Sequence, residues 1–239
     1  MRVLVWNLFH GRSLPPSRSG LKDLFLEMLA ASEWEVALLQ EVPPWWPARV
    51  GNAARARWCA ALTSRNAGLL LRRVLAERWP ELMKSNGGGC NAVLVRGQIA
   101  TCRSLRLRTW PERRVAALVR LADGTCVVNY HGSSRTDLAQ EELRRLCDHA
   151  LAWAGASPLI LGGDLNLRKP QTPAELLHVA SRDVDHLFAR GLKATSAPRL
   201  LERTVTRASL RLELSDHLPI LVELGPGTAP AGAGAHTSR

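Results

Sequence analysis

Short apolar runs recur along the chain, and they constrain its fold more than any other feature of the sequence. They cover residues 3–5, 36–39, 92–95, 115–121, 126–128, 159–161 and 218–222. Uninterrupted apolar runs of this length are typical of strands buried on both faces, because a half-exposed strand would alternate apolar and polar residues. The sequence therefore predicts sheets that are covered on both sides.

Amphipathic stretches separate several of these runs. Residues 21–29 and 136–154 carry apolar side chains at helical spacing, which predicts helices packed against the sheets. A further helix is expected at 69–79, with Leu71, Val74 and Leu75 directed inward. Strands also follow one another directly, as 99–108 and 113–121 do, so the order favours an α/β sandwich with mixed sheets over a regular alternation of strand and helix.

The composition is that of a globular protein. Of the 239 residues, 46% are hydrophobic and 22% are charged, which excludes disorder for most of the chain and allows one large domain. Residues 225–239 are rich in Gly, Pro and Ala and are expected to form a disordered tail. No apolar run is long enough to cross a membrane, and the first residues lack a signal-peptide core, so we expect a cytoplasmic monomer.

The cysteines predict no special chemistry. They stand at positions 59, 90, 102, 126 and 147, a spacing that matches neither a zinc site nor a C-x-x-C redox pair. In a cytoplasmic protein we expect all of them to be reduced, and most of them to serve as small core residues.

The charge balance is strongly basic. The formal net charge is +11, which favours a polyanionic partner or a phosphate-bearing substrate. Only four of the 32 basic residues are lysines, however, and an arginine excess of this kind also follows from a GC-rich coding sequence. Charge alone does not identify the substrate.

Acids, amides and histidines stand where the apolar runs end. Asn7 follows the first run, Gln40 and Glu41 follow the second, and further polar groups occupy positions 129, 131, 164, 166 and 215–217. A carboxylate beside a buried strand is costly unless it is paired, hydrogen-bonded or bound to a metal. Sheet ends are also where α/β proteins assemble ligand sites. A single Asp in such a position is usually a turn residue, but the ordered set predicts a site.

This ordered set resembles the endonuclease/exonuclease/phosphatase superfamily, which includes deoxyribonuclease I. The resemblance covers residues 2–224 and is carried by Leu39-Gln40-Glu41, Gly163-Asp164-Leu165-Asn166 and Ser215-Asp216-His217. It implies a four-layered α/β/β/α sandwich with two mixed sheets and a catalytic domain over residues 1–224. It also implies a hydrolase that cleaves phosphate esters with a divalent metal ion.

The resemblance also implies a role for each polar residue of the set. Glu41 would be the principal ligand of Mg²⁺ or Mn²⁺, with Asn7 and Asp216 beside it, since Mg²⁺ prefers one or two carboxylates together with water and phosphate oxygens. Asp164 would orient and deprotonate the attacking water, and Asn166 would hold the phosphate or Asp164 itself.

The histidines of the set would act on the phosphoryl group. His131 and His217 would donate hydrogen bonds to phosphoryl oxygens as negative charge develops there. Asp185 would orient His217. Asp183 is the alternative for that role, but an exposed loop acid is the interpretation we favour for it.

The substrate is the least constrained part of the hypothesis. DNA is favoured because Arg106 and Arg108 share one face of an arginine-rich strand, and Arg12 follows the first strand closely enough to reach a substrate phosphate. An arginine-rich edge also protects a sheet from aggregation without any ligand. RNA, a phospholipid headgroup or a small phosphate ester are alternatives, as is a catalytically silent nucleic-acid-binding module, which should have lost some of the set.

Overall fold

Two large β-sheets dominate the computed structural model, which describes residues 1–17, 19–63, 66–78, 89–207 and 209–227. In the first sheet β1 and β3 are parallel, and their other neighbours are antiparallel. Its strands, in spatial order, are β12 (Leu192–Ala194), β16 (Ile220–Pro226), β1 (Arg2–Asn7), β3 (Val36–Val42), β5 (Cys90–Val95) and β4 (Arg57–Leu62), with β13 (Arg199–Leu200) also pairing with β16.

The second sheet repeats this arrangement. Its single parallel pair is β8 with β9, and all of its other neighbouring strands are antiparallel. In spatial order the strands are β10 (Leu177–Arg182), β11 (Asp185–Arg190), β9 (Leu159–Asp164), β8 (Cys126–His131), β7 (Arg114–Leu121) and β6 (Ile99–Arg108).

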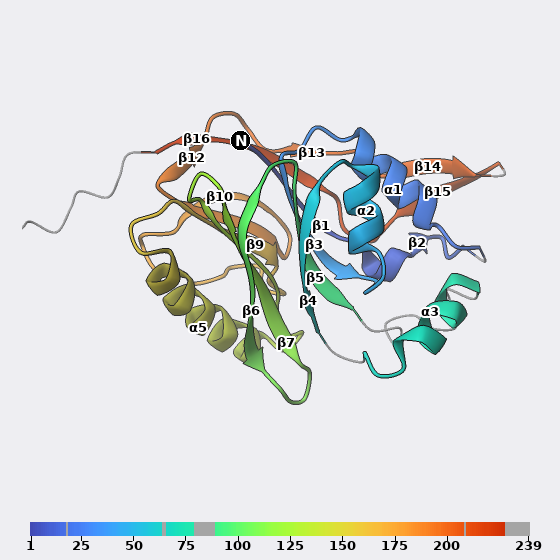
Figure 1. The fold of residues 1–239 in the computed structure, drawn as a ribbon, viewed down its shortest axis with the longest axis horizontal. Coiled ribbons are helices and arrows are strands. Elements are labelled where there is room, and N and C mark those ends of the chain that lie inside the picture. Colours follow the sequence, from blue (N-terminus) through green and yellow to red (C-terminus); the bar gives the residue numbers. More distant parts are fainter. Residues whose placement is uncertain (18, 64–65, 79–88, 208, 228–239) are drawn as a thin grey trace, which may run out of the picture.

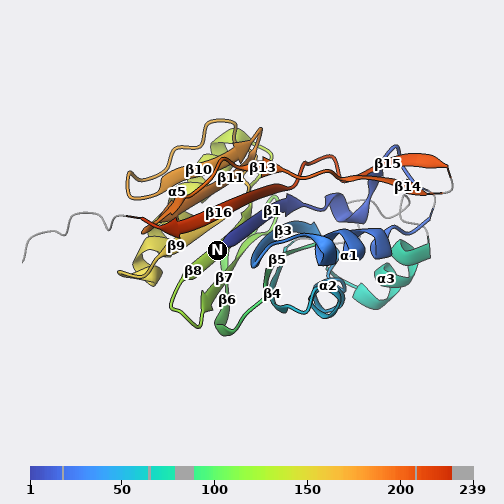
Figure 2. The ribbon, with the colours of Figure 1, turned by 90° about the horizontal axis from the view of Figure 1, so that it is seen from above.

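Helices cover the outer faces of the paired sheets (Figure 1). The helix α1 (Lys22–Ala31) and the short α2 (Pro47–Ala53) lie on the first sheet, and α5 (Thr136–Ala154) lies on the second. A small sheet of β14 (Thr204–Arg207), β15 (Leu210–Leu214) and β2 (Ser13–Leu14) extends beyond one end of the large sheets (Figure 2). The remaining described helices are the 3₁₀ turn η1 (Phe9–Gly11) and α3 (Leu69–Arg78). None of these helices is long and apolar enough to span a membrane.

Alternate residues of each strand enter different apolar layers. Val3 and Val5 pack between the two sheets, whereas Leu4 and Trp6 pack against α1 and its surroundings. Strands buried on both faces therefore read as continuous apolar runs, as the sequence indicated. The predicted α/β/β/α sandwich is confirmed.

Buried amides tie the two sheets together. The Gln40 side chain donates to Asn129 Oδ1 over 2.7 Å, and Asn129 Nδ2 in turn donates to the Leu39 and Ala92 carbonyls. Gln40 and Asn129 are fully buried, and these bonds satisfy Gln40 Nε2 and both polar atoms of the Asn129 side chain, which would otherwise be costly to bury. They also fix where one sheet sits on the other.

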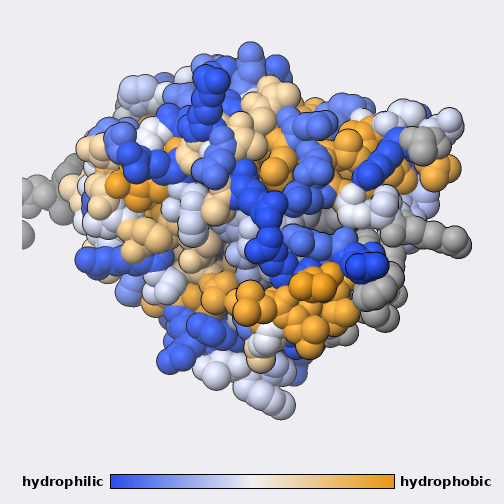
Figure 3. Space-filling view, turned by 45° about the vertical axis from the view of Figure 1, so that its right-hand side comes forward, coloured by the Kyte–Doolittle hydropathy of each residue, from blue (hydrophilic) through white to orange (hydrophobic). Residues whose placement is uncertain are grey.

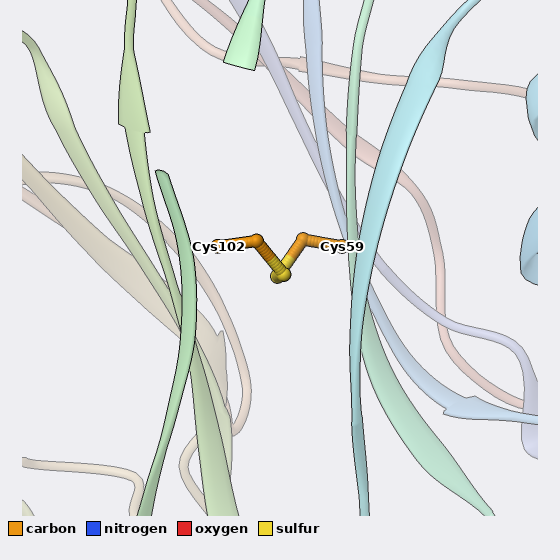
Figure 4. Close-up of a disulfide and its surroundings, with 2 residues drawn as sticks. All are labelled: Cys59 and Cys102. Carbon is orange, nitrogen blue, oxygen red and sulfur yellow. A yellow bond between two sulfur atoms is a disulfide. The ribbon is translucent and has the colours of Figure 1, made fainter. Parts of the chain in front are cut away.

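The prediction that every cysteine is reduced is wrong. Cys59 in β4 and Cys102 in β6 form a disulfide that bridges the edge strands of the two sheets (Figure 4). Spacing could not reveal it, because the pair is separated by 43 residues and meets only when the sheets pack. The other three cysteines, Cys90, Cys126 and Cys147, are free and buried, as expected of core residues.

Two further expectations differ from the structure. The helix expected at 69–79 forms as α3. Its Leu71 and Val74 are exposed rather than directed inward, and α3 has no buried residue. Strand β16 extends over Gly225 and Pro226, which pair with β12, two residues into the expected tail. The rest of that tail, from residue 228, lies outside the described residues.

Candidate active site

The polar residues that follow the buried strands converge at one end of the sandwich. Asn7 ends β1, Glu41 lies in β3, and His131 and Asp164 end the parallel strands β8 and β9. Asn7 Nδ2 donates to Asp164 Oδ2 over 2.8 Å and joins the two sheets. Parallel neighbouring strands end at the same edge of their sheet. The parallel pairs of the two sheets meet at this edge, so both sheets contribute residues to one site.

Unusual backbone conformations shape this end of the molecule. Gly163 has a φ of +135°, and a Cβ at this position would lie 2.0 Å from the Tyr130 carbonyl oxygen, so only glycine fits beside β8. Glu41, Asn166 and Ser215 have φ values of 50°, 52° and 72°. Non-glycine residues in this region are strained, and such strain is typical of functional sites. All three belong to the motifs that the sequence singled out.

Asp164 is held by donors on both of its oxygens. Besides the bond from Asn7 to Oδ2, the Asn166 backbone N–H donates to Oδ1 over 3.0 Å. The Asn166 side chain donates to the Gly132 carbonyl at 3.0 Å, which connects this turn to the segment after His131. The Nε2 atoms of His131 and His217 lie 3.6 and 3.7 Å from Asp164 Oδ2. The carboxylate is thus fixed, and both imidazoles face it.

The two histidines differ in protonation. Burial lowers the pKa of His131, although the charges of Asp164 and Glu41 partly oppose this, and the ring is therefore neutral at pH 7. Burial acts the same way on His217, but its hydrogen bond to Asp185 and the charges of Asp185, Asp164 and Asp216 outweigh it and raise the pKa to about 9. His217 is therefore an imidazolium.

Asp185 is the residue that holds His217. Its Oδ2 lies 2.7 Å from His217 Nδ1, while Asp183 pairs with Arg168 at 3.3 Å on the surface. Burial raises the pKa of Asp185 to about 6, and the bond to His217 opposes this rise. Because the histidine retains its proton to higher pH than the acid, the proton of this pair resides on His217 at pH 7.

Glu41 lies opposite this pair and has a partner that the sequence hypothesis did not include. His10, in η1, places Nε2 at 3.1 Å from Glu41 Oε2, and His131 Nε2 lies 4.0 Å from Oε1. From the sequence, His10 stands three residues after Asn7, where a surface loop was the preferred interpretation. The left-handed backbone at Phe9 and His10 instead brings the His10 side chain back to the site.

The carboxylates around Glu41 fit a divalent cation. Burial raises the pKa of Glu41, the charge of His131 lowers it, and the nearby charges of Asp164 and Asp216 raise it further. Gathered carboxylates of this kind repel one another unless a cation lies among them. Asp164, Asp185 and His217 also bring one ligand atom each to within 4.8 Å of one another, but the proton shared by Asp185 and His217 suits a hydrogen bond better than a metal.

A cavity of about 820 Å³, much larger than a phosphate group needs, opens at this site. The predicted site residues that line it are Asn7, Glu41, His131, Asp164, Asn166, Asp216 and His217. The sequence hypothesis did not include the residues that line its outer part. On the first-sheet side they are Phe9, His10, Thr63, Asn66, Ala67 and Gly89, and on the second-sheet side they are Ser134 and the turn from Thr109 to Arg114 except Trp110. Their contribution depends on how loops fold over the site, which strand patterns do not show.

The arginines proposed to bind substrate lie elsewhere. Arg12, Arg106 and Arg108 are not among the described residues lining the cavity. Arg12 stacks on the Phe9 ring at 4.2 Å, and Arg106 is exposed. Arg108 forms ion pairs with Glu141 and Glu142 of α5, so its guanidinium already has acidic partners. DNA binding by Arg106 and Arg108 stays a prediction, which the ion pairs of Arg108 weaken.

Comparison with known proteins identifies the family. The model of the endonuclease/exonuclease/phosphatase family matches residues 4–217. The chain belongs to this family. Its members are phosphoesterases and generally use divalent metal ions. Membership of the family indicates that this chain is a phosphoesterase. No curated protein matches the chain in sequence.

Solved structures share the fold at low sequence identity. An endonuclease/exonuclease/phosphatase from Beutenbergia cavernae is 19% identical, with a TM-score of 0.69, covering 97% of this chain and 73% of that one. The mannosyl-6-phosphatase of Bacteroides thetaiotaomicron is 15% identical, with a TM-score of 0.69, covering 94% and 99%. TDP2 from Caenorhabditis elegans is also 15% identical, with a TM-score of 0.66, covering 93% and 73%. These likenesses describe the fold alone.

Proposed function

We propose that this protein is a divalent-metal-dependent phosphodiesterase in which Asp164 activates a water for in-line attack on phosphorus. The observation that carries the proposal is the setting of Asp164, fixed through both oxygens and faced by one neutral and one charged imidazole. A general base must be positioned before its basicity matters, and this carboxylate has little freedom to turn away.

The histidines supply donors to the phosphoryl oxygens. His217 offers an imidazolium N–H at Nε2, and its other nitrogen is held by Asp185. His131 is neutral and can donate from one nitrogen only. Donors fixed before the reaction stabilise negative charge as it forms, without the cost of reorienting water.

Glu41, Asn7 and Asp216 would hold Mg²⁺ or Mn²⁺. When bound, the ion would neutralise charge on the phosphoryl oxygens and on the leaving group. Asn7 fits this role through its Oδ1, which accepts from the Phe9 N–H at 2.9 Å and has a second lone pair. His10 Nε2 lies 3.1 Å from Glu41 Oε2 and would keep this carboxylate directed at the ion.

The test uses bis-p-nitrophenyl phosphate, a soluble diester, with Mg²⁺ or Mn²⁺. Chelation and Glu41→Gln should each abolish turnover, while Asp164→Asn should lower kcat by about 10² to 10⁴-fold, the usual contribution of a general base. Glu175→Gln changes the same chemistry on the surface and serves as the matched control. Full activity in excess chelator, or in Glu41→Gln, would contradict the proposal.

DNA cleavage remains the sequence-based prediction for the substrate. Adding supercoiled plasmid and RNA to the same assay tests it directly. The ion pair of Arg108 with Glu142 weakens the argument from Arg108, whereas the Arg106 side chain is exposed.

A further inference from the structure

The helix α3 presents its apolar side to solvent. Leu70, Leu71 and Val74 are 83%, 66% and 60% exposed. Arg72 and Arg73, which would ordinarily face water, are only half-exposed. A surface helix normally turns its apolar residues to the core, and exposed apolar clusters commonly mark sites of interaction.

This helix lies at the mouth of the catalytic cavity. Asn66 and Ala67, just before α3, line the cavity on one side. Thr109 and Pro111 line it on the other side, and between them Trp110 is 81% exposed. We call Leu70, Leu71, Val74 and Trp110 the apolar rim. Figure 3 shows an apolar patch low on one face of the molecule.

Positive charge accompanies the apolar rim. The helix α3 carries Arg72, Arg73 and Arg78 against the single acid Glu77, which pairs with Arg73 at 3.2 Å. Across the mouth, Arg113 and Arg114 line the cavity beside the acid Glu112. The whole chain carries a net charge of +11. Arginine beside leucine and tryptophan is typical of segments that lie in the interface of an anionic bilayer, where guanidinium groups meet lipid phosphates and apolar side chains enter the acyl region.

We propose that the apolar rim docks on an anionic phospholipid bilayer and that the substrate is a phosphodiester in a lipid headgroup. The proposal rests on the phosphodiesterase function proposed above. A bilayer held at the rim would present headgroups directly to Asp164 and the two histidines. A protein bound at the same place would instead cover the mouth and exclude substrate.

A nucleic acid fits the rim less well. Leu70, Leu71 and Val74 offer neither charge for phosphates nor a flat ring on which a base could stack, and Trp110 alone has such a ring. A small soluble ester would need no apolar residues outside the cavity. The chemistry of α3 therefore favours the lipid surface.

The binding test compares Leu71→Glu with Leu177→Glu, an equivalent change at a 54% exposed leucine in β10, at the far edge of the second sheet. Wild type should co-sediment with vesicles of phosphatidylcholine and phosphatidylglycerol. Leu71→Glu should bind them about tenfold or more weakly, because burial of an apolar side chain is replaced by a repelled charge. Leu177→Glu should bind like wild type. Trp110→Ala, on the opposite side of the mouth, should also weaken binding.

Three binding results would overturn the proposal. Wild type could remain in the supernatant, the two glutamate variants could bind equally, or Leu71→Glu could alter DNA binding or self-association while vesicle binding stays unchanged. Circular dichroism should be the same for all variants, since each replaced side chain is exposed.

The activity test separates this proposal from the one on which it rests. Leu71→Glu should hydrolyse bis-p-nitrophenyl phosphate like wild type but release about tenfold less water-soluble phosphate ester from vesicles, in line with its weaker binding. If wild type with metal cleaves the soluble diester but no vesicle lipid, the lipid substrate is wrong and the phosphodiesterase function stands. If wild type binds vesicles but cleaves neither substrate, the phosphodiesterase function fails.

Discussion

The inner part of the cavity, which holds the proposed catalytic and metal-binding residues and is called the floor below, differs from the apolar rim in how it is built. On the floor, Asp164 receives hydrogen bonds from Asn7 and from the Asn166 backbone, and Asp185 holds His217. On the rim, α3 has no buried residue and Trp110 is 81% exposed. The floor is set by strands with two covered faces, whereas the four residues of the apolar rim are all exposed.

The contrast between floor and rim divides two tasks: the floor holds the groups proposed to act on the phosphate, and the rim holds residues that would select the substrate. Groups that stabilise a transition state act best when they do not reorient, and packed sheets provide that rigidity. Rim residues can change without disturbing the sandwich, because they contribute little to its core. A family with one reaction and many substrates is expected from such a division.

Apart from the changes to Glu41 and Asp164 proposed above, the largest effects should come from the coupled residues His217 and Asp185. His217→Ala should lower kcat/KM by about 10² to 10³-fold, as is usual for a lost transition-state donor. Asp185→Asn should cost a similar factor, and the double variant little more, because Asp185 acts through His217. Steady-state kinetics of the three variants form a double-mutant cycle. Fully additive losses would show that the two residues act separately.

The disulfide at the sheet edge should affect stability more than chemistry. Cys59→Ala with Cys102→Ala should lower the free energy of unfolding by about 2 to 4 kcal/mol, since the bond closes a long loop in the unfolded chain. Urea titration with and without a reducing agent measures this. Because the loop contains α3 and one side of the rim, KM for a large substrate should rise while kcat stays near wild type. A fall in kcat alone would contradict the separation of floor from rim.

Arg106 and Arg108 distinguish a structural arginine from a surface arginine. Glu142 is fully buried and accepts hydrogen bonds from Tyr130, Ser133 and Arg108. Arg108→Gln should therefore destabilise the protein by about 1.5 to 3 kcal/mol. Arg106→Gln should change stability by less than about 0.5 kcal/mol. Thermal unfolding of both variants is the measurement, and equal stabilities would mean that Arg108 is not needed by Glu142.

A pair of histidines in β10 and β11 should give a smaller effect than Arg108 does. His178 Nε2 lies 3.1 Å from His186 Nδ1, and His186 Nε2 donates to the Leu167 carbonyl at 2.7 Å. Burial lowers the pKa of both rings. Below pH about 6.5, these histidines therefore bind protons in the unfolded chain but remain neutral in the folded chain. The free energy of unfolding falls as the pH is lowered.

His178→Gln keeps a donor to His186 but does not titrate. It should flatten the loss of stability between pH 7 and 5 by no more than about 1 kcal/mol, because His178 is exposed and solvent screens its charge. Denaturant unfolding at several pH values provides the comparison. An unchanged pH dependence would mean that His178 titrates alike in both states.

The sequence predicted the floor much better than the rim. Asn7, Glu41, His131 and Asp164 follow buried strands, and a polar residue in that position either finds a partner or destabilises the fold. Their convergence therefore follows from strand patterns together with sheet topology. The pairing of Asp185 with His217 came from the resemblance to a family, since no local spacing relates two residues 32 positions apart.

What the sequence missed depends on contacts between distant segments. Arg108 looks like any surface arginine until α5 brings Glu142 against it, 34 residues later. Leu71 and Val74 have the spacing of a buried helix face, but in the structure both are exposed and α3 has no buried residue. Periodicity indicates that a face is apolar, and the partner of that face has to come from tertiary structure.

The matching strand orders of the two sheets have a consequence for the whole molecule. The strands β16, β1, β3, β5 and β4 correspond in position to β11, β9, β8, β7 and β6, an approximate two-fold relation that the sequence does not display as a repeat. Links between the sheets join strands with their own counterparts: Asn7 to Asp164, Gln40 to Asn129 and Cys59 to Cys102, and His217, just before β16, meets Asp185 at the start of β11. Each half of the molecule therefore carries only one member of every pair. The active site is a property of their junction, and a slide of one half along the other would disrupt all of these links together.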